Sequence, residues 1–137
     1  MPTLMKLTER VTESARWFSD PSARVRHFSE FYHPKAVFHG YVRGSSLDLA
    51  QACNFYSTLW EAFPDFRVRI LRAVEEPGMV AFHYSWEGTH KGAYAGFAPS
   101  NHQVHIVGMS FVRFEAQQVI ERWNVSDSGV LVTQLRG

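Results

Sequence analysis

Cysteine and long apolar runs are scarce in this sequence. Cys53 is the single cysteine, which excludes an intrachain disulfide and a cysteine-based zinc site and favours a reducing, cytoplasmic location. No apolar run approaches the length of a transmembrane helix, and residues 1–18 carry charges where a signal peptide would be apolar. We therefore expect a protein that is neither exported nor membrane-bound.

An excess of charge of one sign is also missing. The formal net charge is +1, and basic residues alternate with acidic ones along the chain. A nucleic-acid-binding protein would usually concentrate basic residues on one face, so we expect no nucleic-acid partner. No histidine pair stands with a carboxylate at the spacing of metal ligands, so we expect no metal site.

Apolar and aromatic residues are abundant instead, at 45% and 15% of the 137 residues. This length and composition predict one domain, residues 1–137, with a substantial core.

Three helices are expected in the first half of the chain. The apolar residues of the first recur at helical spacing: Leu4, Leu7, Val11, Ala15 and Phe18. A second helical segment begins near Pro21 and runs to Tyr32, where the following proline ends it; residues 36–39 then form a short strand. Residues 45–48 are typical of a helix start with a capping box, and an apolar stripe predicts a third helix from Leu49 to Phe63.

From Phe66 onward the apolar period changes from about 3.6 to 2, which indicates strands. We expect strands at 66–70, 80–86, 104–114 and 119–125, the last two forming a hairpin around residues 115–118. In the 80–86 strand one face is apolar and aromatic: Val80, Phe82, Tyr84 and Trp86. The 104–114 strand is partly apolar on both faces, so we expect another subunit to cover its second face.

Helices followed by strands predict an α+β fold, with helices packed over the concave face of a curved antiparallel sheet. Such a closure leaves a pocket lined by the aromatic residues, and the Gly- and Pro-containing segment 88–101 is expected at its rim.

Several short motifs in this order resemble the SnoaL-like polyketide cyclases of the NTF2-like superfamily. They are Phe63-Pro64-Asp65, Gly88-Thr89-His90-Lys91-Gly92, Gly96-Phe97-Ala98-Pro99, Glu121-Arg122-Trp123-Asn124 with Asp127, and Gln134-Leu135. The resemblance implies an NTF2-like cone and a homodimer. It also implies cofactor-free, metal-free acid/base catalysis of an aldol ring closure on a small hydrophobic or polycyclic carbonyl compound.

The resemblance places the catalytic aspartate at the end of the last strand, at Asn124 or Asp127. An amide cannot transfer a proton, so Asn124 at that place would mean loss of the acid/base group. Asp127 is the candidate carboxylate, although an aspartate there could equally cap a helix at 128–135. His39, at the end of a strand, is a further catalytic candidate, with a surface or structural role as the alternative.

The candidate substrate-binding residues lie on the strands, the third helix and the rim segment. They are Arg122, Ser110, Tyr84, Trp86, Trp60 and His90. Arg122 and Asn124 share one face of their strand and could hold a substrate carbonyl, and Ser110 is expected across the hairpin from one of them. A solvated face or a salt bridge is the alternative for Arg122. Ordinary core packing is the alternative for the aromatic residues, and a backbone-bonded hydroxyl is the alternative for Ser110.

Two functions follow as hypotheses: a cyclase that uses a carboxylate in the pocket, and a non-catalytic small-molecule-binding or dimerisation module. A pocket that contains Asn124, Ser110 and Arg122, with Asp127 on a helix cap, would favour binding or a different chemistry.

Overall fold

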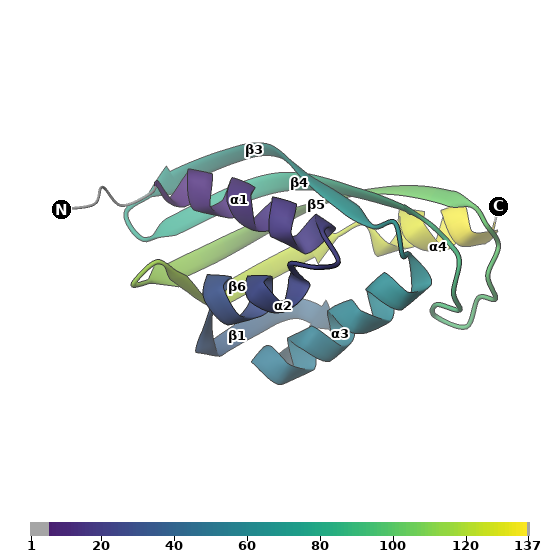
Figure 1. The fold of residues 1–137 in the computed structure, drawn as a ribbon, viewed down its shortest axis with the longest axis horizontal. Coiled ribbons are helices and arrows are strands. Elements are labelled where there is room, and N and C mark those ends of the chain that lie inside the picture. The colour runs from purple at the N-terminus through teal and green to yellow at the C-terminus, as the bar shows by residue number, and fades with distance from the viewer. Residues whose placement is uncertain (1–5, 137) are drawn as a thin grey trace.

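The computed structural model describes residues 6–136, which form a six-stranded sheet with three helical segments on one face (Figure 1). In chain order the elements are α1 (Leu7–Ser19), α2 (Arg24–Arg26), the π-helical turn η1 (His27–Phe31), β1 (Tyr32–Val42), β2 (Ser45–Leu47), α3 (Leu49–Ala62), β3 (Arg67–Glu76), β4 (Met79–Thr89), β5 (Gln103–Glu115), β6 (Gln118–Ser126) and α4 (Ser128–Arg136). This confirms the α+β class.

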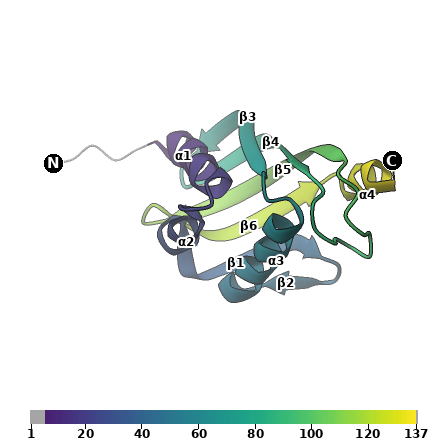
Figure 2. The same cartoon turned by 45° about the vertical axis from the view of Figure 1, so that its right-hand side comes forward.

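The strand order is β2-β1-β6-β5-β4-β3. Neighbouring strands are antiparallel except β1 and β6, which pair in parallel. The helices α1, α2 and α3 lie on the same side of the curved sheet, and α4 follows β6 beside one end of β5 (Figure 2). Within residues 6–136, no helix has both the length and the apolarity needed to cross a membrane.

The alternation predicted for the strands is confirmed. Val80, Phe82, Tyr84 and Trp86 of β4 are buried on the helix side of the sheet. In β5, Val104, Ile106 and Val112 are buried while the residues of the opposite parity are exposed. The hairpin is also confirmed: β5 ends at Glu115 and β6 begins at Gln118.

Phe18 of α1 joins the helical layer to the sheet. Its ring meets those of Tyr56 and Trp60 of α3 edge-on, at centroid distances of 4.7 and 5.0 Å. It also lies 5.2 Å from Phe66, which precedes β3. Edge-to-face aromatic contacts of this kind add to the stabilisation from apolar burial.

The third helix begins as predicted. The Asp48 carboxylate accepts a hydrogen bond from Gln51 N at 2.8 Å, and the Gln51 side chain accepts one from Asp48 N at 2.9 Å. This capping box satisfies two backbone donors at the start of α3 and fixes where the helix begins.

The segment between the first helix and the sheet differs from the prediction. The second helix is the short α2, continued by η1, and β1 already begins at Tyr32 and runs through His33-Pro34 to Val42. Proline cannot donate to a strand ladder, and the β1–β6 register is indeed irregular between Tyr32 and Val37. The strand β2 was not predicted, β3 extends beyond residue 70 to Glu76, and Leu4 lies outside the described residues.

Candidate functional site

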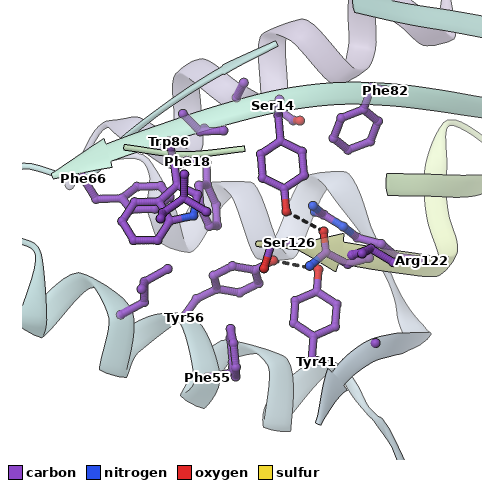
Figure 3. Close-up of a pocket in the computed structure, with 18 of the residues that line it drawn as sticks. Ser14, Phe18, Tyr41, Phe55, Tyr56, Phe66, Phe82, Trp86, Arg122 and Ser126 are labelled. Atoms are coloured by element: carbon purple, nitrogen blue, oxygen red, sulfur yellow. Dashed lines mark hydrogen bonds between the residues drawn. The ribbon is translucent and has the colours of Figure 1, made fainter. Parts of the chain in front are cut away.

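A cavity of about 420 Å³ lies between the helices and the concave face of the sheet (Figure 3). Its volume falls within the usual range of small-molecule pockets, roughly 300–1,000 Å³. Most of its wall is aromatic or aliphatic and comes from α1, α3 and the central strands, with Phe18, Tyr41, Tyr56, Phe66, Phe82 and Trp86 among the lining residues. Such a wall suits a bulky apolar guest.

One hydrogen-bonded cluster interrupts the apolar wall. Asn124 Oδ1 accepts hydrogen bonds from Tyr84 Oη and Ser110 Oγ, each at 2.7 Å. Arg122 Nη2 donates to Ser110 Oγ at 3.1 Å, and Arg122 Nη1 donates to Tyr32 Oη at 2.7 Å. These five residues, Tyr32, Tyr84, Ser110, Arg122 and Asn124, are called the polar cluster below.

The orientation of the Asn124 amide follows from these contacts. An arginine side chain only donates, so Ser110 Oγ must accept a hydrogen bond from Arg122 and donate its own O–H to Asn124 Oδ1. The oxygen of the amide therefore faces the two hydroxyl groups. Its NH₂ group has no protein acceptor within residues 6–136 and remains a donor in a residue that lines the cavity.

Strand register brings the cluster together. In the β5–β6 ladder Ser110 lies opposite Asn124 and Val112 opposite Arg122, so the three polar side chains share one face. Tyr84 of β4 lies opposite Gly108 of β5, where a Cβ atom would overlap the tyrosine hydroxyl. The missing side chain at Gly108 thus leaves room for the Tyr84 hydroxyl to reach Asn124.

Gly40 performs a related role on β1. It has a φ of +87°, a conformation that glycine adopts without strain, and a Cβ atom there would overlap the main-chain carbonyl of Asn124. The absent side chain lets β1 approach β6 closely at the cavity wall.

A second polar pair in the cavity wall joins α3 to β1. Tyr56 Oη of α3 donates to Tyr41 Oη of β1 at 2.7 Å (Figure 3). Burial raises the pKa of both phenols, and it also raises the pKa of Tyr84. All three hydroxyl groups are therefore neutral at pH 7.

His27 is a cavity-lining residue that the sequence analysis missed. It is 3% exposed, and both ring nitrogens lack a protein hydrogen-bond partner within residues 6–136. Aromatic rings surround it, including Phe18 at 4.9 Å and Tyr32 at 5.3 Å between centroids. Burial lowers the pKa of His27 to about 3, so the imidazole is neutral at pH 7. His27 belongs to an apolar helical segment, so its position in the sequence does not distinguish a cavity-lining histidine from a core residue.

Asp127 lies outside the cavity lining. Its Oδ1 accepts a hydrogen bond from Val130 N at 3.1 Å, and the residue is exposed in front of α4. This is the helix-capping geometry weighed as the alternative for this residue. Of the two candidate positions, Asn124 is the one that lines the cavity.

His39 is on the outer face of the sheet. Strand alternation buries its neighbour Phe38 and turns His39 away from the cavity, where its Nε2 lies 2.8 Å from Glu121 Oε2. Its ring stacks on Trp123 at 5.3 Å. His39 was predicted at a strand end, but β1 continues to Val42, and the side chain lies on the face opposite the cavity.

The predicted binding residues divide into two groups. Arg122, Tyr84 and Trp86 line the cavity, and Ser110 joins two cavity residues. Trp60 packs beneath the Arg24 guanidinium, whose Cζ is 4.4 Å from the ring centroid, and is not part of the lining. His90 is buried in the 88–101 segment, where its Nδ1 lies 2.9 Å from Ser100 Oγ.

Among residues 6–136, the cavity lining thus offers hydrogen-bond donors and one permanent cation, and it contains no carboxylate. The only described arginine in the lining is Arg122, which lies beneath the rings of Phe82 and Tyr41. Within residues 6–136, no three His, Cys, Asp or Glu side chains gather as they would around a metal ion. This arrangement can bind and polarise a carbonyl group, but none of its residues is a carboxylate that could shuttle a proton.

Known structures share this architecture. IdmH from Streptomyces antibioticus, a proposed polyketide cyclase, is 20% identical, with a TM-score of 0.84 over 97% of this chain and 100% of that one. AclR from Streptomyces galilaeus, a proposed hydroxylase, is 20% identical, with a TM-score of 0.84 over 96% and 98% of the chains. A proposed polyketide cyclase from Acidithiobacillus ferrooxidans is 23% identical, with a TM-score of 0.80 over 99% and 98%.

At these identities the neighbours show the fold, which is NTF2-like, and nothing about the reaction. None of the curated proteins compared matches the chain. The sequence profile of the SnoaL-like polyketide cyclases matches residues 10–135, nearly the whole chain. The protein therefore belongs to the SnoaL-like polyketide cyclase family.

Proposed function

We propose that the protein binds a hydrophobic, carbonyl-bearing small molecule in the cavity and promotes its intramolecular aldol ring closure. The observation that carries this proposal is the Asn124 amide, whose oxygen is occupied by Tyr84 and Ser110. Its NH₂ group is thereby left as an oriented donor at an apolar cavity of about 420 Å³. Such a donor can hold a substrate carbonyl as negative charge develops on its oxygen.

The proposed reaction relies on positioning and on stabilisation of an enolate oxygen. Ring closure requires loss of a proton next to one carbonyl and attack of the resulting carbon on a second carbonyl. Asn124 and Arg122 donate to the oxygen that becomes negative, and the aromatic wall holds the chain folded. Solvent water accepts the proton from carbon and returns one to the alkoxide that ring closure forms, because the described lining supplies no carboxylate and Asn124 cannot transfer a proton.

The test is turnover of an aromatic methyl ketone that carries an ortho acetonyl group. Its aldol closure and dehydration give a fluorescent naphthol, which can be followed continuously. We expect faster naphthol formation with the protein than in buffer, and loss of that acceleration in Asn124→Leu. If the ketone binds but naphthol formation is not accelerated, the protein is a binding module. If the ketone does not bind and naphthol formation is not accelerated, the cavity is not a ligand site.

A non-catalytic binding module is the second candidate function. Asp127 caps α4 while Asn124 occupies the cavity, so the acid/base group implied by the family resemblance is not among the lining residues. This observation favours a protein that keeps the pocket of the family for binding alone. The turnover experiment separates the two functions.

We also propose that the protein is a homodimer through the outer face of its sheet. Five apolar residues on that face are at least 37% exposed: Val107, Met109, Phe111, Trp123 and Val125. They are adjacent across the β5–β6 ladder, with Met109 opposite Val125 and Phe111 opposite Trp123. A contiguous apolar surface of this kind is typical of a protein–protein interface, and we call it the outer apolar face.

A further inference from the structure

Arg122 brings a full positive charge to the cavity wall without a carboxylate to balance it. Its guanidinium hydrogen-bonds to Tyr32 Oη and Ser110 Oγ, which are hydroxyl groups. Within residues 6–136 it makes no salt bridge, although other side-chain ion pairs lie on the protein surface. A cation enclosed by protein without a counterion is costly, since protein solvates charge less well than water does.

The tyrosines near Arg122 do not supply the missing negative charge. Burial raises the pKa of Tyr41, Tyr56 and Tyr84, so all three hydroxyl groups are neutral at pH 7. The imidazole of His27, which also lines the cavity, is neutral as well. The net charge of the described cavity wall is therefore that of Arg122.

Arg122 also retains hydrogen-bonding capacity. A guanidinium has five N–H donors. The bonds to Tyr32 and Ser110 use one N–H of Nη1 and one of Nη2, which leaves the second N–H of each, while Nε is buried without a partner among the described residues. The side chain is partly exposed because it faces the cavity.

We propose that the ligand of this cavity is an aromatic or polycyclic anion whose negative oxygen pairs with Arg122. The charge comes either from a carboxylate or from an acidic hydroxyl ionised to a phenolate or enolate. This depends on the proposed function, in which the cavity receives the ligand. The apolar wall contacts the rings, Asn124 donates to a carbonyl, and Arg122 compensates the negative oxygen. Charge-assisted hydrogen bonds to a guanidinium are stronger than neutral ones, so the charge should decide which of two equally shaped ligands binds.

Naphthoate and naphthamide test this directly, because they match in shape and differ in charge at neutral pH. By titration calorimetry we expect naphthoate to bind about tenfold more tightly than naphthamide to the unaltered protein. Arg122→Gln should abolish the preference, and Arg122→Lys, which keeps the charge, should retain part of it. Arg113→Gln removes a cation that pairs with Glu121 outside the cavity, and it should leave the preference intact.

Equal affinities for the two probes in the unaltered protein would overturn the anion proposal while leaving the cavity as a ligand site. If neither probe binds to the unaltered protein, both proposals are overturned. If Arg122→Gln does not fold, the comparison of probes in the unaltered protein still decides. Naphthol separates the two anion sources: ionisation on binding, seen in its absorption, supports a phenolate or enolate ligand, whereas weak binding as the neutral form supports a carboxylate ligand.

Discussion

The hydroxyl of Tyr84 donates to the side-chain oxygen of Asn124 at 2.7 Å, across the central strand β5 that separates their own strands. Gly108 of β5 makes this reach possible, because a Cβ atom there would overlap the hydroxyl. The contact therefore depends on three strands at once.

Gly108→Ala should destabilise the protein by about 1–3 kcal/mol through overpacking, and it should weaken ligand binding by displacing the Tyr84 hydroxyl. Urea unfolding and naphthoate titration measure the two effects. In a Tyr84→Leu background the same substitution should cost less, since both the hydroxyl and the ring carbon Cζ that the new Cβ atom would overlap are gone. Equal costs in both backgrounds would show that Gly108 acts independently of Tyr84.

Asn124→Asp should give a folded protein, because a carboxylate at this position can accept the same two hydrogen bonds from Ser110 and Tyr84. The new negative charge near Arg122 should weaken naphthoate binding by about tenfold and supply a proton acceptor for ring closure. Turnover of the ortho-acetonyl ketone should then decrease as pH is lowered and the carboxylate becomes protonated. Unchanged naphthoate affinity would contradict the charge argument.

Asp127→Asn should leave both turnover and ligand affinity unchanged, because asparagine is as good a helix N-cap as aspartate. Asp127→Ala should lower the free energy of unfolding by about 1 kcal/mol through loss of the bond to Val130 N. Thermal unfolding and the ketone assay are the measurements. A large loss of turnover in Asp127→Asn would restore this residue as the acid/base group.

His27→Leu should change how stability depends on pH. Burial lowers the pKa of His27 to about 3, so the folded protein leaves this imidazole neutral while the unfolded chain protonates it below about pH 6.5. The unaltered protein should therefore lose stability relative to the variant between pH 6.5 and 3, by about 1.4 kcal/mol per pH unit. Urea unfolding at pH 7 and pH 5 measures the difference, with the exposed His105→Gln controlling for loss of a histidine. Parallel curves for the unaltered protein and His27→Leu would contradict a neutral buried imidazole.

Met109→Lys should produce a monomer, because it places a charge within the outer apolar face. Light scattering coupled to size exclusion at micromolar concentration gives the mass. Val25→Lys, which alters an exposed apolar residue of α2 on the helix side of the sheet, should leave the dimer intact. A monomeric mass for the unaltered protein would exclude the proposed homodimer.

The strands and their faces could be predicted because one alternation, in Val80–Trp86, fixes which side of the sheet is buried. The polar parity of Ser110, Arg122 and Asn124 similarly predicted three residues that the structure brings together. Position along the chain was less informative at His39, because this residue lies within β1 and not at the predicted strand end, and the alternation of the strand turns it to the outer face.

Other features depend on tertiary contacts that no local pattern records. The strand β1 passes through His33-Pro34 because its irregular pairing with β6 tolerates a residue without an N–H group. His27 belongs to the cavity only because α1 and η1 meet over the sheet. Asn124 and Asp127 could not be distinguished from sequence, since each suits a strand end followed by a helix.

The parallel pairing of β1 with β6 has a consequence for biosynthesis. Tyr32 and Arg122 are 90 positions apart in the chain, yet they meet in one hydrogen bond at the cavity wall. While the ribosome has still to add residues 118–126, β1 has an open edge and the pocket has neither its guanidinium nor its amide. A small molecule can thus aid maturation of this fold only after translation has passed that strand.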